Sequence, residues 1–185
     1  GEKSKAIISD SSIDATSSGS NAIFSTDSAS VLANNVNITT SAANSRGLDA
    51  TYGGSIIANA MTISTKGDHS ASLATDRGGG SVSVTDSTLN TAGSGSSTGD
   101  IEVSGVTGTA SGSQIAGMEG LNTILINNST LESTNTGTTG SDPVANGVII
   151  YQSTSGDAES STGQHATFQA KDSTLKSAIT SGSMF

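Results

Sequence analysis

Six side chains that could bind a sugar lie at related positions in the first half of the chain. Asp27, Tyr52 and Arg77 follow one another at equal intervals, and three related side chains stand close to them: Phe24, Asp49 and Asp76. Aromatic rings offer flat apolar faces, while carboxylates and guanidinium groups form strong hydrogen bonds. Coils stacked about 4.8 Å apart would bring all six into one patch. The spacing therefore predicts a ligand-binding patch, with a solvated polar face as the alternative interpretation.

Three carboxylates in the second half of the chain suggest a metal site. Asp142, Asp157 and Glu159 lie in two segments that lack an apolar periodicity, and calcium takes oxygen ligands of this kind. The chain has neither an EF-hand loop nor a glycine-rich nonapeptide repeat. We therefore expect no required cofactor, and calcium is the metal that these residues suggest.

Catalytic groups are scarce in this sequence. The absence of Cys excludes thiolate chemistry, and the two histidines, His69 and His165, stand far apart. With 36 Ser in the chain, a Ser-His-Asp combination can be drawn almost anywhere and carries no information. Glycoside hydrolysis needs paired carboxylates, and no convincing pair is found. We expect that the chain is not an enzyme, and polysaccharide lyase is the enzyme class worth testing.

The candidate residues are embedded in an internal repeat. Its period is about 25 residues, a length typical of solenoid repeats. Its signature is Asp or Asn, then Ser, then an apolar residue in the fourth place. Clear copies begin at Asp10, Asp86, Asn128 and Asp172, and weaker copies begin at Asn35, Ala60 and Gly105. The starts at 10, 35, 60 and 86 are almost evenly spaced, and the later ones are less regular. A near-constant spacing indicates stacked coils.

Each repeat carries the pattern of two half-buried strands joined by a corner. Around Asp86, the apolar residues Val82 and Val84 precede the corner and Leu89 follows it. This alternation is typical of strands with one buried face, and its phase changes across the Asp or Asn. Because Asp and Asn tolerate the left-handed backbone region, one such residue can turn the chain. The pattern predicts a ladder of corner residues: Asp10, Asn35, Asp86, Asn128 and Asp172.

A repeat made only of strands predicts an all-β fold. We expect a single-stranded right-handed parallel β-helix, a solenoid of about seven coils. One domain over 1–185 is expected, as a fragment truncated at both ends, with loop insertions at 134–146 and 152–166. The coil that starts at Asp86 is short near residues 94–97, so either it is pinched there or residues are absent from this chain.

The corner ladder also carries a resemblance to known proteins. Its Asp-Ser-Thr-Leu copies at Asp86 and Asp172 resemble the tight Asn-bearing corner of the right-handed parallel β-helix superfamily typified by pectate lyases. In character the coils are most similar to bacterial β-helical adhesin-like surface proteins. The resemblance implies a fold and names no activity.

Composition and charge narrow the choice of partners. The chain has 36 Ser and 25 Thr among 185 residues, and its formal net charge is −9. Excess negative charge argues against nucleic acid and anionic membrane surfaces as partners. No apolar run approaches the roughly 20 residues that a membrane span requires, so no membrane insertion is expected. An acidic, Cys-free and hydroxyl-rich chain is typical of exported bacterial proteins, and we expect an extracellular or cell-surface location.

These observations favour a structural and binding segment of an extracellular bacterial surface protein. It would be adhesin-like, and its expected partners are glycans or host or cell-surface proteins. A polysaccharide-active enzyme of the lyase or hydrolase type is one alternative. A self-assembling extracellular fibre subunit, joined by end-to-end self-association of coils, is the other.

Overall fold

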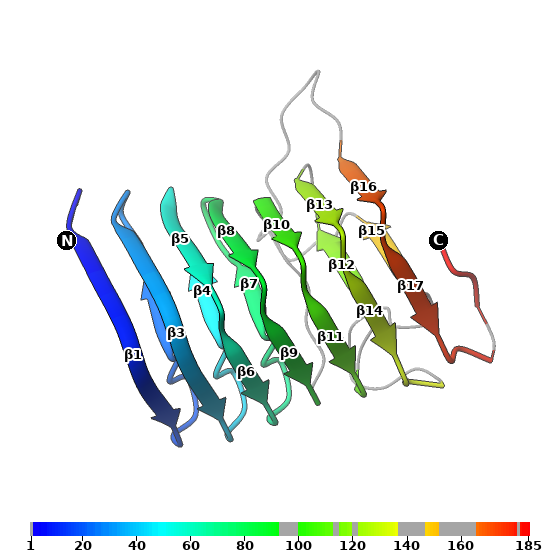
Figure 1. The fold of residues 1–185 in the computed structure, drawn as a ribbon, viewed down its shortest axis with the longest axis horizontal. Coiled ribbons are helices and arrows are strands. Elements are labelled where there is room, and N and C mark those ends of the chain that lie inside the picture. Colours follow the sequence, from blue (N-terminus) through cyan, green and yellow to red (C-terminus); the bar gives the residue numbers. More distant parts are fainter. Residues whose placement is uncertain are drawn as a thin grey trace.

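Strands make up the regular structure of this protein. The computed structural model describes residues 2–92, 100–112, 115–119, 122–136, 147–151, 166–180 and 182–185. Within these ranges it contains seventeen strands and no helix. Successive turns of the chain stack side by side along one axis (Figure 1), and the strands of neighbouring turns pair in parallel. The fold is therefore a parallel β-solenoid, as the repeat predicts.

Three walls form each coil, and the first two share a twelve-stranded sheet. The first wall contains β1 (Lys5–Ala15) and β3 (Ser30–Thr40), which continue around the corner, and then β5 (Gly54–Asn59), β8 (Gly80–Thr85), β10 (Asp100–Ser104), β13 (Thr123–Asn127) and β16 (Thr167–Lys171). The second wall contains β6 (Thr62–Thr65), β9 (Thr88–Thr91), β11 (Thr107–Ala110), β14 (Thr130–Ser133) and β17 (Thr174–Ser177).

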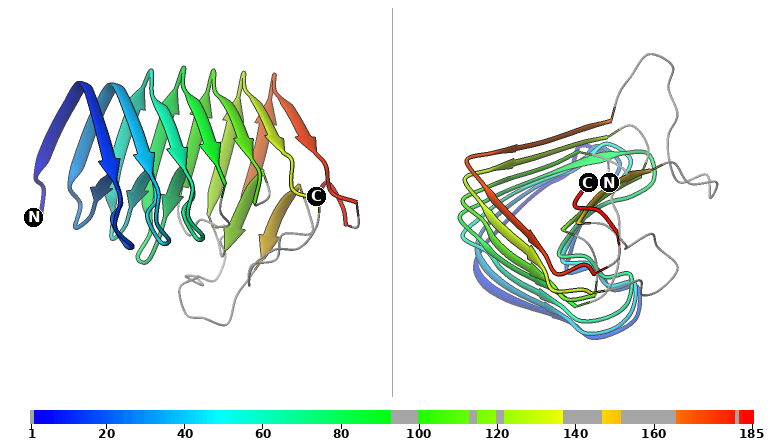
Figure 2. Two further views of the ribbon diagram at one scale, coloured as in Figure 1. Left: turned by 90° about the horizontal axis from the view of Figure 1, so that it is seen from below. Right: turned by 90° about the vertical axis from the view of Figure 1, so that its right-hand side faces the viewer.

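The third wall is formed by return strands in two smaller sheets. One sheet contains β2 (Ile23–Ser25), β4 (Leu48–Ala50) and β7 (Leu73–Thr75). The other contains β12 (Ala116–Glu119) and β15 (Val148–Tyr151). Seen along the axis, the coils superimpose (Figure 2).

The structure has about five coils, and the prediction of seven was wrong. Seven strands stack in the first wall of the described ranges, but only five return strands are found there. The prediction counted corner signatures, which mark where a coil starts. A corner signature carries no information on the strand that completes the coil, so the number of corners does not fix the number of coils.

The chain turns through the left-handed backbone region at every signature start. The φ angle is 46–54° at six of them and 67° at the glycine: Asp10, Asn35, Ala60, Asp86, Asn128, Asp172 and Gly105. Strand pairing continues in register on both sides of the corner, with Ser9 opposite Asn34 and Ser11 opposite Val36. A single residue with positive φ therefore reverses which face of the strand points inward, since the side chains alternate on each side of it.

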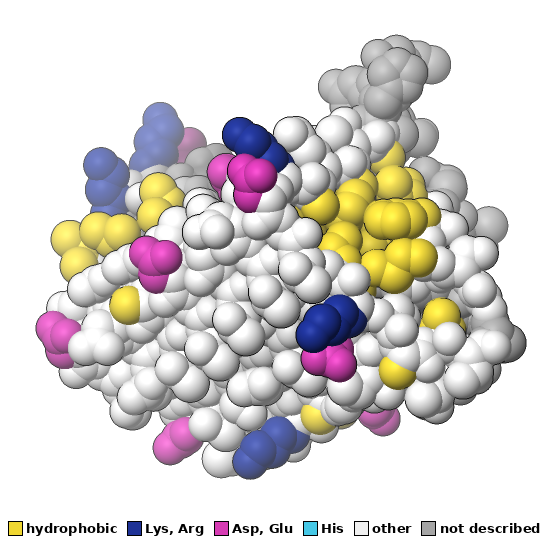
Figure 3. Space-filling view, turned by 45° about the vertical axis from the view of Figure 1, so that its right-hand side comes forward, with side chains coloured by type: hydrophobic (Ala, Val, Ile, Leu, Met, Phe, Trp, Pro, Cys, Tyr) yellow, Lys and Arg dark blue, Asp and Glu magenta, His cyan; other side chains and the backbone are white. Residues whose placement is uncertain are grey.

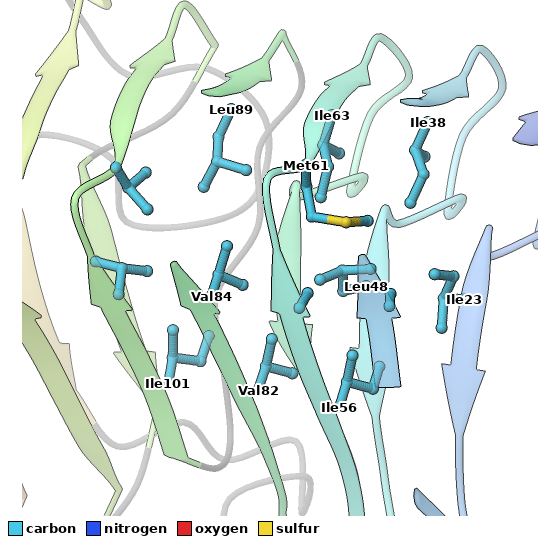
Figure 4. Packing of buried hydrophobic residues seen from close by; sticks show 14 of the residues in the cluster. Ile23, Ile38, Leu48, Ile56, Met61, Ile63, Val82, Val84, Leu89 and Ile101 are labelled. Carbon is cyan, nitrogen blue, oxygen red and sulfur yellow. The ribbon is translucent and has the colours of Figure 1, made fainter. Parts of the chain in front are cut away.

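The hydrophobic core is a narrow column enclosed by the coils. Ile38, Ile63 and Val84 are at most 2% exposed, and such side chains stack from one coil to the next (Figure 4). The position directly after the corner also faces inward, where Val36 and Met61 are buried. The sequence pattern did not identify this stack of residues after the corner as buried.

Buried serines satisfy the backbone of the corners. The Ser87 Oγ accepts a hydrogen bond from the Met61 N–H at 2.9 Å and donates one to the Thr85 carbonyl oxygen at 2.6 Å. The Ser129 Oγ likewise accepts from the Val106 N–H at 3.0 Å. Buried hydroxyls are costly unless they are hydrogen-bonded. These contacts explain how a chain so rich in serine can fill its own interior.

Candidate functional site

The return strands place the predicted ligand-binding patch on the outside of the first coils. In the β2, β4 and β7 sheet, Phe24 lies opposite Asp49, and Asp49 lies opposite Ala74. The adjacent residue Leu48 is fully buried in the core. Because side chains alternate along a strand, Phe24 and Asp49 point to the outer face. Phe24 is 51% exposed there.

Asp49 is buried although it lies on the outer face, and it is only 2% exposed. The guanidinium group of Arg46 lies beside it, with Nη1 3.7 Å from Asp49 Oδ2. The Nη2 atom of the same group is 3.4 Å from Asp76 Oδ2, which follows β7. One guanidinium group therefore bridges carboxylates that belong to two successive coils.

Asn21 extends this arrangement to a third coil. Its Nδ2 donates a hydrogen bond to Asp49 Oδ2 at 2.7 Å, and its Oδ1 accepts one from the Arg46 backbone N–H at 2.8 Å. We refer to Asn21, Arg46, Asp49 and Asp76 as the Arg46 cluster. Because its contacts cross three coils, the cluster fixes the Arg46 guanidinium group on the outer face.

The Asp49 carboxyl has an unusual acidity. Burial raises its pKa from the ordinary value of 3.8 to about 6, Arg46 lowers it, Asp76 raises it further, and the hydrogen bond from Asn21 lowers it. Both donors face Oδ2, whereas Oδ1 is buried and has no hydrogen-bond partner among the described residues. Burial outweighs the attraction of one shared guanidinium, so this carboxyl changes charge near pH 6.

Tyr52 occupies a strained corner near the Arg46 cluster. Its φ is 45° and its side chain is 55% exposed. Its backbone N–H donates to the Arg77 carbonyl oxygen at 3.0 Å, and its carbonyl accepts from the Ser28 N–H at 3.1 Å. The ring lies against Gly78, where a Cβ would strike it. A bulky residue with positive φ is energetically costly and is often found at functional sites.

The two remaining residues of the predicted patch lie at the same set of corners. Asp27 is exposed and has a φ of 53°, and Arg77 is exposed. The third repeat, from Ala60 to Asp86, is one residue longer than the two before it, so Gly78, not Arg77, occupies the place of Tyr52 in the third coil. All six predicted residues belong to the third wall or its corners, but the burial of Asp49 prevents it from contacting a ligand directly.

Sequence reasoning missed Arg46 and Asn21 as part of this site. When the repeats are aligned, each column holds the residues at one repeat position, and Arg46 stands in a different column from Asp49 and Asp76. Such columns show which backbone positions stack. They do not show how far a long side chain reaches across them. The available signal was the position of Arg46 three residues before an acid in an outward place.

The predicted calcium ligands, Asp142, Asp157 and Glu159, lie outside the described residues, as do most of the insertions at 134–146 and 152–166. Within the part of the chain that the structure describes, no three His, Asp or Glu side chains gather as a metal site would require. That same part contains no helix of the length and apolar character needed to cross a membrane.

The rest of the visible surface offers weaker candidates. Figure 3 shows a face formed largely by uncharged polar side chains and backbone, with scattered charged side chains and a contiguous group of hydrophobic side chains on the right of the view. An exposed aliphatic row, Ile7, Leu32 and Ile57, pairs in register across β1, β3 and β5. Three side chains are too few for a stable protein interface, which buries about 800 Å² on each partner.

Comparison with known proteins adds no assignment. No family model matches the chain, and neither a curated protein nor a solved structure matches it. The function of the site must therefore be inferred from its own chemistry.

Proposed function

We propose that this chain is a rigid structural and binding segment of an extracellular bacterial surface protein. In this proposal it is adhesin-like, and the outer face of β2, β4 and β7 binds glycans, with a host or cell-surface protein as the other expected class of partner. We also propose that the solenoid is right-handed, since parallel crossovers are right-handed in about 98% of cases.

The observation that carries this proposal is the presence of exposed aromatic rings on the same wall and corner as a guanidinium group that two carboxylates hold. Phe24 and Tyr52 are each about half exposed, whereas Phe is among the residue types that are most often fully buried. Arg46 is held by two carboxylates. A sugar has an apolar C–H face that stacks on a ring and hydroxyls that hydrogen-bond to charged groups, so this combination suits a glycan.

The rigidity of the scaffold supports the same conclusion. The backbone under the patch is tied to the next coils by parallel ladders and by the buried Ser45 and Ser70 hydroxyls. A surface that is already fixed loses little conformational entropy on binding. Weak polar contacts can then give useful affinity.

A glycan-array screen of the purified chain, with calcium and with a chelator, tests this proposal. We expect binding that is lost in the Phe24→Ala/Tyr52→Ala double variant and kept in the Leu32→Ala/Ile57→Ala control, which changes exposed side chains on another wall. Binding that persists after deletion of residues 152–166 would assign it to the patch and not to that insertion. No binding to any glycan would refute glycan recognition and leave a protein partner or a spacer role.

The two alternative functions, a polysaccharide-active enzyme and a self-assembling fibre subunit, remain predictions. Rising ultraviolet absorbance during incubation with a uronic acid polymer would support the lyase. Elongated particles that form as concentration increases would support the fibre subunit.

A further inference from the structure

The Asp49 carboxyl is arranged so that it can bind a proton without losing its present contacts. Its Oδ2 receives the hydrogen bond from Asn21 Nδ2 at 2.7 Å and faces Arg46 Nη1 at 3.7 Å. Its Oδ1 is buried and, within the part of the chain that the structure describes, has no hydrogen-bond partner. A proton from solvent that binds Oδ1 would remove the negative charge and leave the contacts of Oδ2 in place.

Loss of this charge would change the electrostatics of Arg46. In the ionised state, two carboxylates share one guanidinium group, and the distance to Asp76, 3.4 Å, is shorter than the distance to Asp49. Asp76 Oδ1 also accepts a hydrogen bond from the backbone N–H of Arg77 at 2.9 Å. Phe24 and Ala74, the neighbours of Asp49 in β2 and β7, are uncharged. Among the described residues, protonation of Asp49 therefore leaves Asp76 as the one carboxylate within salt-bridge distance of Arg46.

We propose that Asp49 is a proton-controlled switch, so that the outer face of β2, β4 and β7 binds carboxylate-bearing glycans more tightly in mildly acidic solution than at neutral pH. This inference rests on the proposed function. A neutral Asp49 makes the Arg46 cluster more positive by one charge. An approaching uronate then meets less repulsion, and the Arg46 side chain, which is 24% exposed, is accessible to it. A sugar without a charge does not sense the difference.

The acidity of Asp49 agrees with this geometry. Its pKa of about 6 results mainly from burial. The charge change therefore falls between about pH 5 and 7, a range in which a uronate stays ionised because carboxylates exposed to water titrate near pH 4.

Calorimetric titration with two matched probes tests the switch. One probe is a hexamer of galacturonic acid, and the other is its fully methyl-esterified form, which has the same sugars without charge. We expect the acidic hexamer to bind about three- to tenfold more tightly at pH 5 than at pH 7.5, and the ester to bind equally at both. In the Asp49→Asn variant, the tighter binding should persist at pH 7.5. Glu102→Gln, which removes an exposed carboxylate of β10 on another wall, should keep the ratio between the two pH values.

The outcomes separate the switch from the proposed function. Equal affinity of the wild-type chain for the acidic hexamer at both pH values overturns the switch alone, as does pH dependence that survives Asp49→Asn. Failure of both hexamers to bind at either pH overturns glycan binding and the switch together. The carboxyl carbon-13 shift of Asp49 gives a readout without ligand: a titration midpoint near pH 6 supports the switch, and a flat profile from pH 5 to 7.5 overturns it.

Discussion

The backbone N–H of Ser45 donates a hydrogen bond to the Oγ of Ser70, 3.0 Å away in the next coil. The Ser70 hydroxyl in turn lies 2.9 Å from the carbonyl oxygen of Asp68 and 3.1 Å from that of Ala42, and Ser70 is fully buried. One small side chain thus satisfies backbone groups on two coils. This contact shows how the solenoid uses serine in place of bulky apolar residues at its corners.

Replacing Ser70 by Ala is expected to lower the free energy of unfolding by about 1–3 kcal/mol, because buried backbone groups lose their partner. Chemical denaturation measures the change. Ser81→Ala, at an exposed position of β8, serves as the control and should change stability by less than about 0.5 kcal/mol. Equal effects of the two substitutions would contradict the role assigned to the Ser70 hydroxyl.

Stability should depend on pH through Asp49. Its folded-state pKa of about 6 lies above the ordinary 3.8, so the folded protein holds the proton more tightly than the unfolded chain. The contribution of Asp49 is therefore greatest below about pH 4 and is lost as pH rises through 6, by about 3 kcal/mol in total. Asp49→Asn should lack this loss. Denaturation of both proteins between pH 4 and 7.5 measures the difference, and parallel pH profiles would contradict the prediction.

The corner at Ala60 is expected to become more stable when Asn replaces Ala. Ala60 has a φ of 54°, a conformation in which Asn is favoured over Ala. Ala60→Asn should stabilise the protein by about 1 kcal/mol, measured as a rise in the denaturation midpoint. Ala92→Asn is the matched control, since Ala92 is also exposed but has no positive φ. A gain of the same size at Ala92 would show that the corner conformation is not the cause.

Two adjacent glycines allow the position of the Tyr52 ring to be tested. Gly78 and Gly79 have φ angles of 71° and 66°, but only a Cβ at Gly78 would strike the Tyr52 ring, and one at Gly79 meets nothing within 4 Å. In both Ala variants the free energy of unfolding should fall by about 1 kcal/mol, because Ala disfavours the left-handed backbone region. Only Gly78→Ala should also displace the ring and change tyrosine fluorescence and glycan binding. Identical fluorescence in the two variants would mean that the ring does not rest on Gly78.

The inward and outward assignment of the second wall can be tested within one strand. Ile63 is fully buried in β6, whereas Thr62 beside it is exposed. Ile63→Asp should unfold the protein, because it places an unpaired carboxylate in the core. Thr62→Asp should retain the circular dichroism spectrum and most of the stability. Native stability of the Ile63→Asp variant would contradict the assignment.

Asp49 marks the limit of what a column pattern can predict. Its place in an outward column correctly puts it on the outer face with Phe24, and the same reasoning would make it exposed. It is buried beside Arg46 and Asn21, which stand outside its column. The count of coils failed for a related reason, since a corner signature cannot show whether a return strand follows.

The strand-only solenoid and the left-handed backbone at its corners follow from local features of the amino-acid sequence. The alternation of apolar residues and the conformational tolerance of Asp, Asn and Gly are local properties, so they can be read from residues close together in the chain. Which polar groups are buried and paired depends instead on how the coils stack. The Arg46 cluster joins side chains that are far apart in the chain, from Asn21 to Asp76. Its burial and the raised pKa of Asp49 depend on the stacking of three coils, a long-range contact that no local pattern specifies.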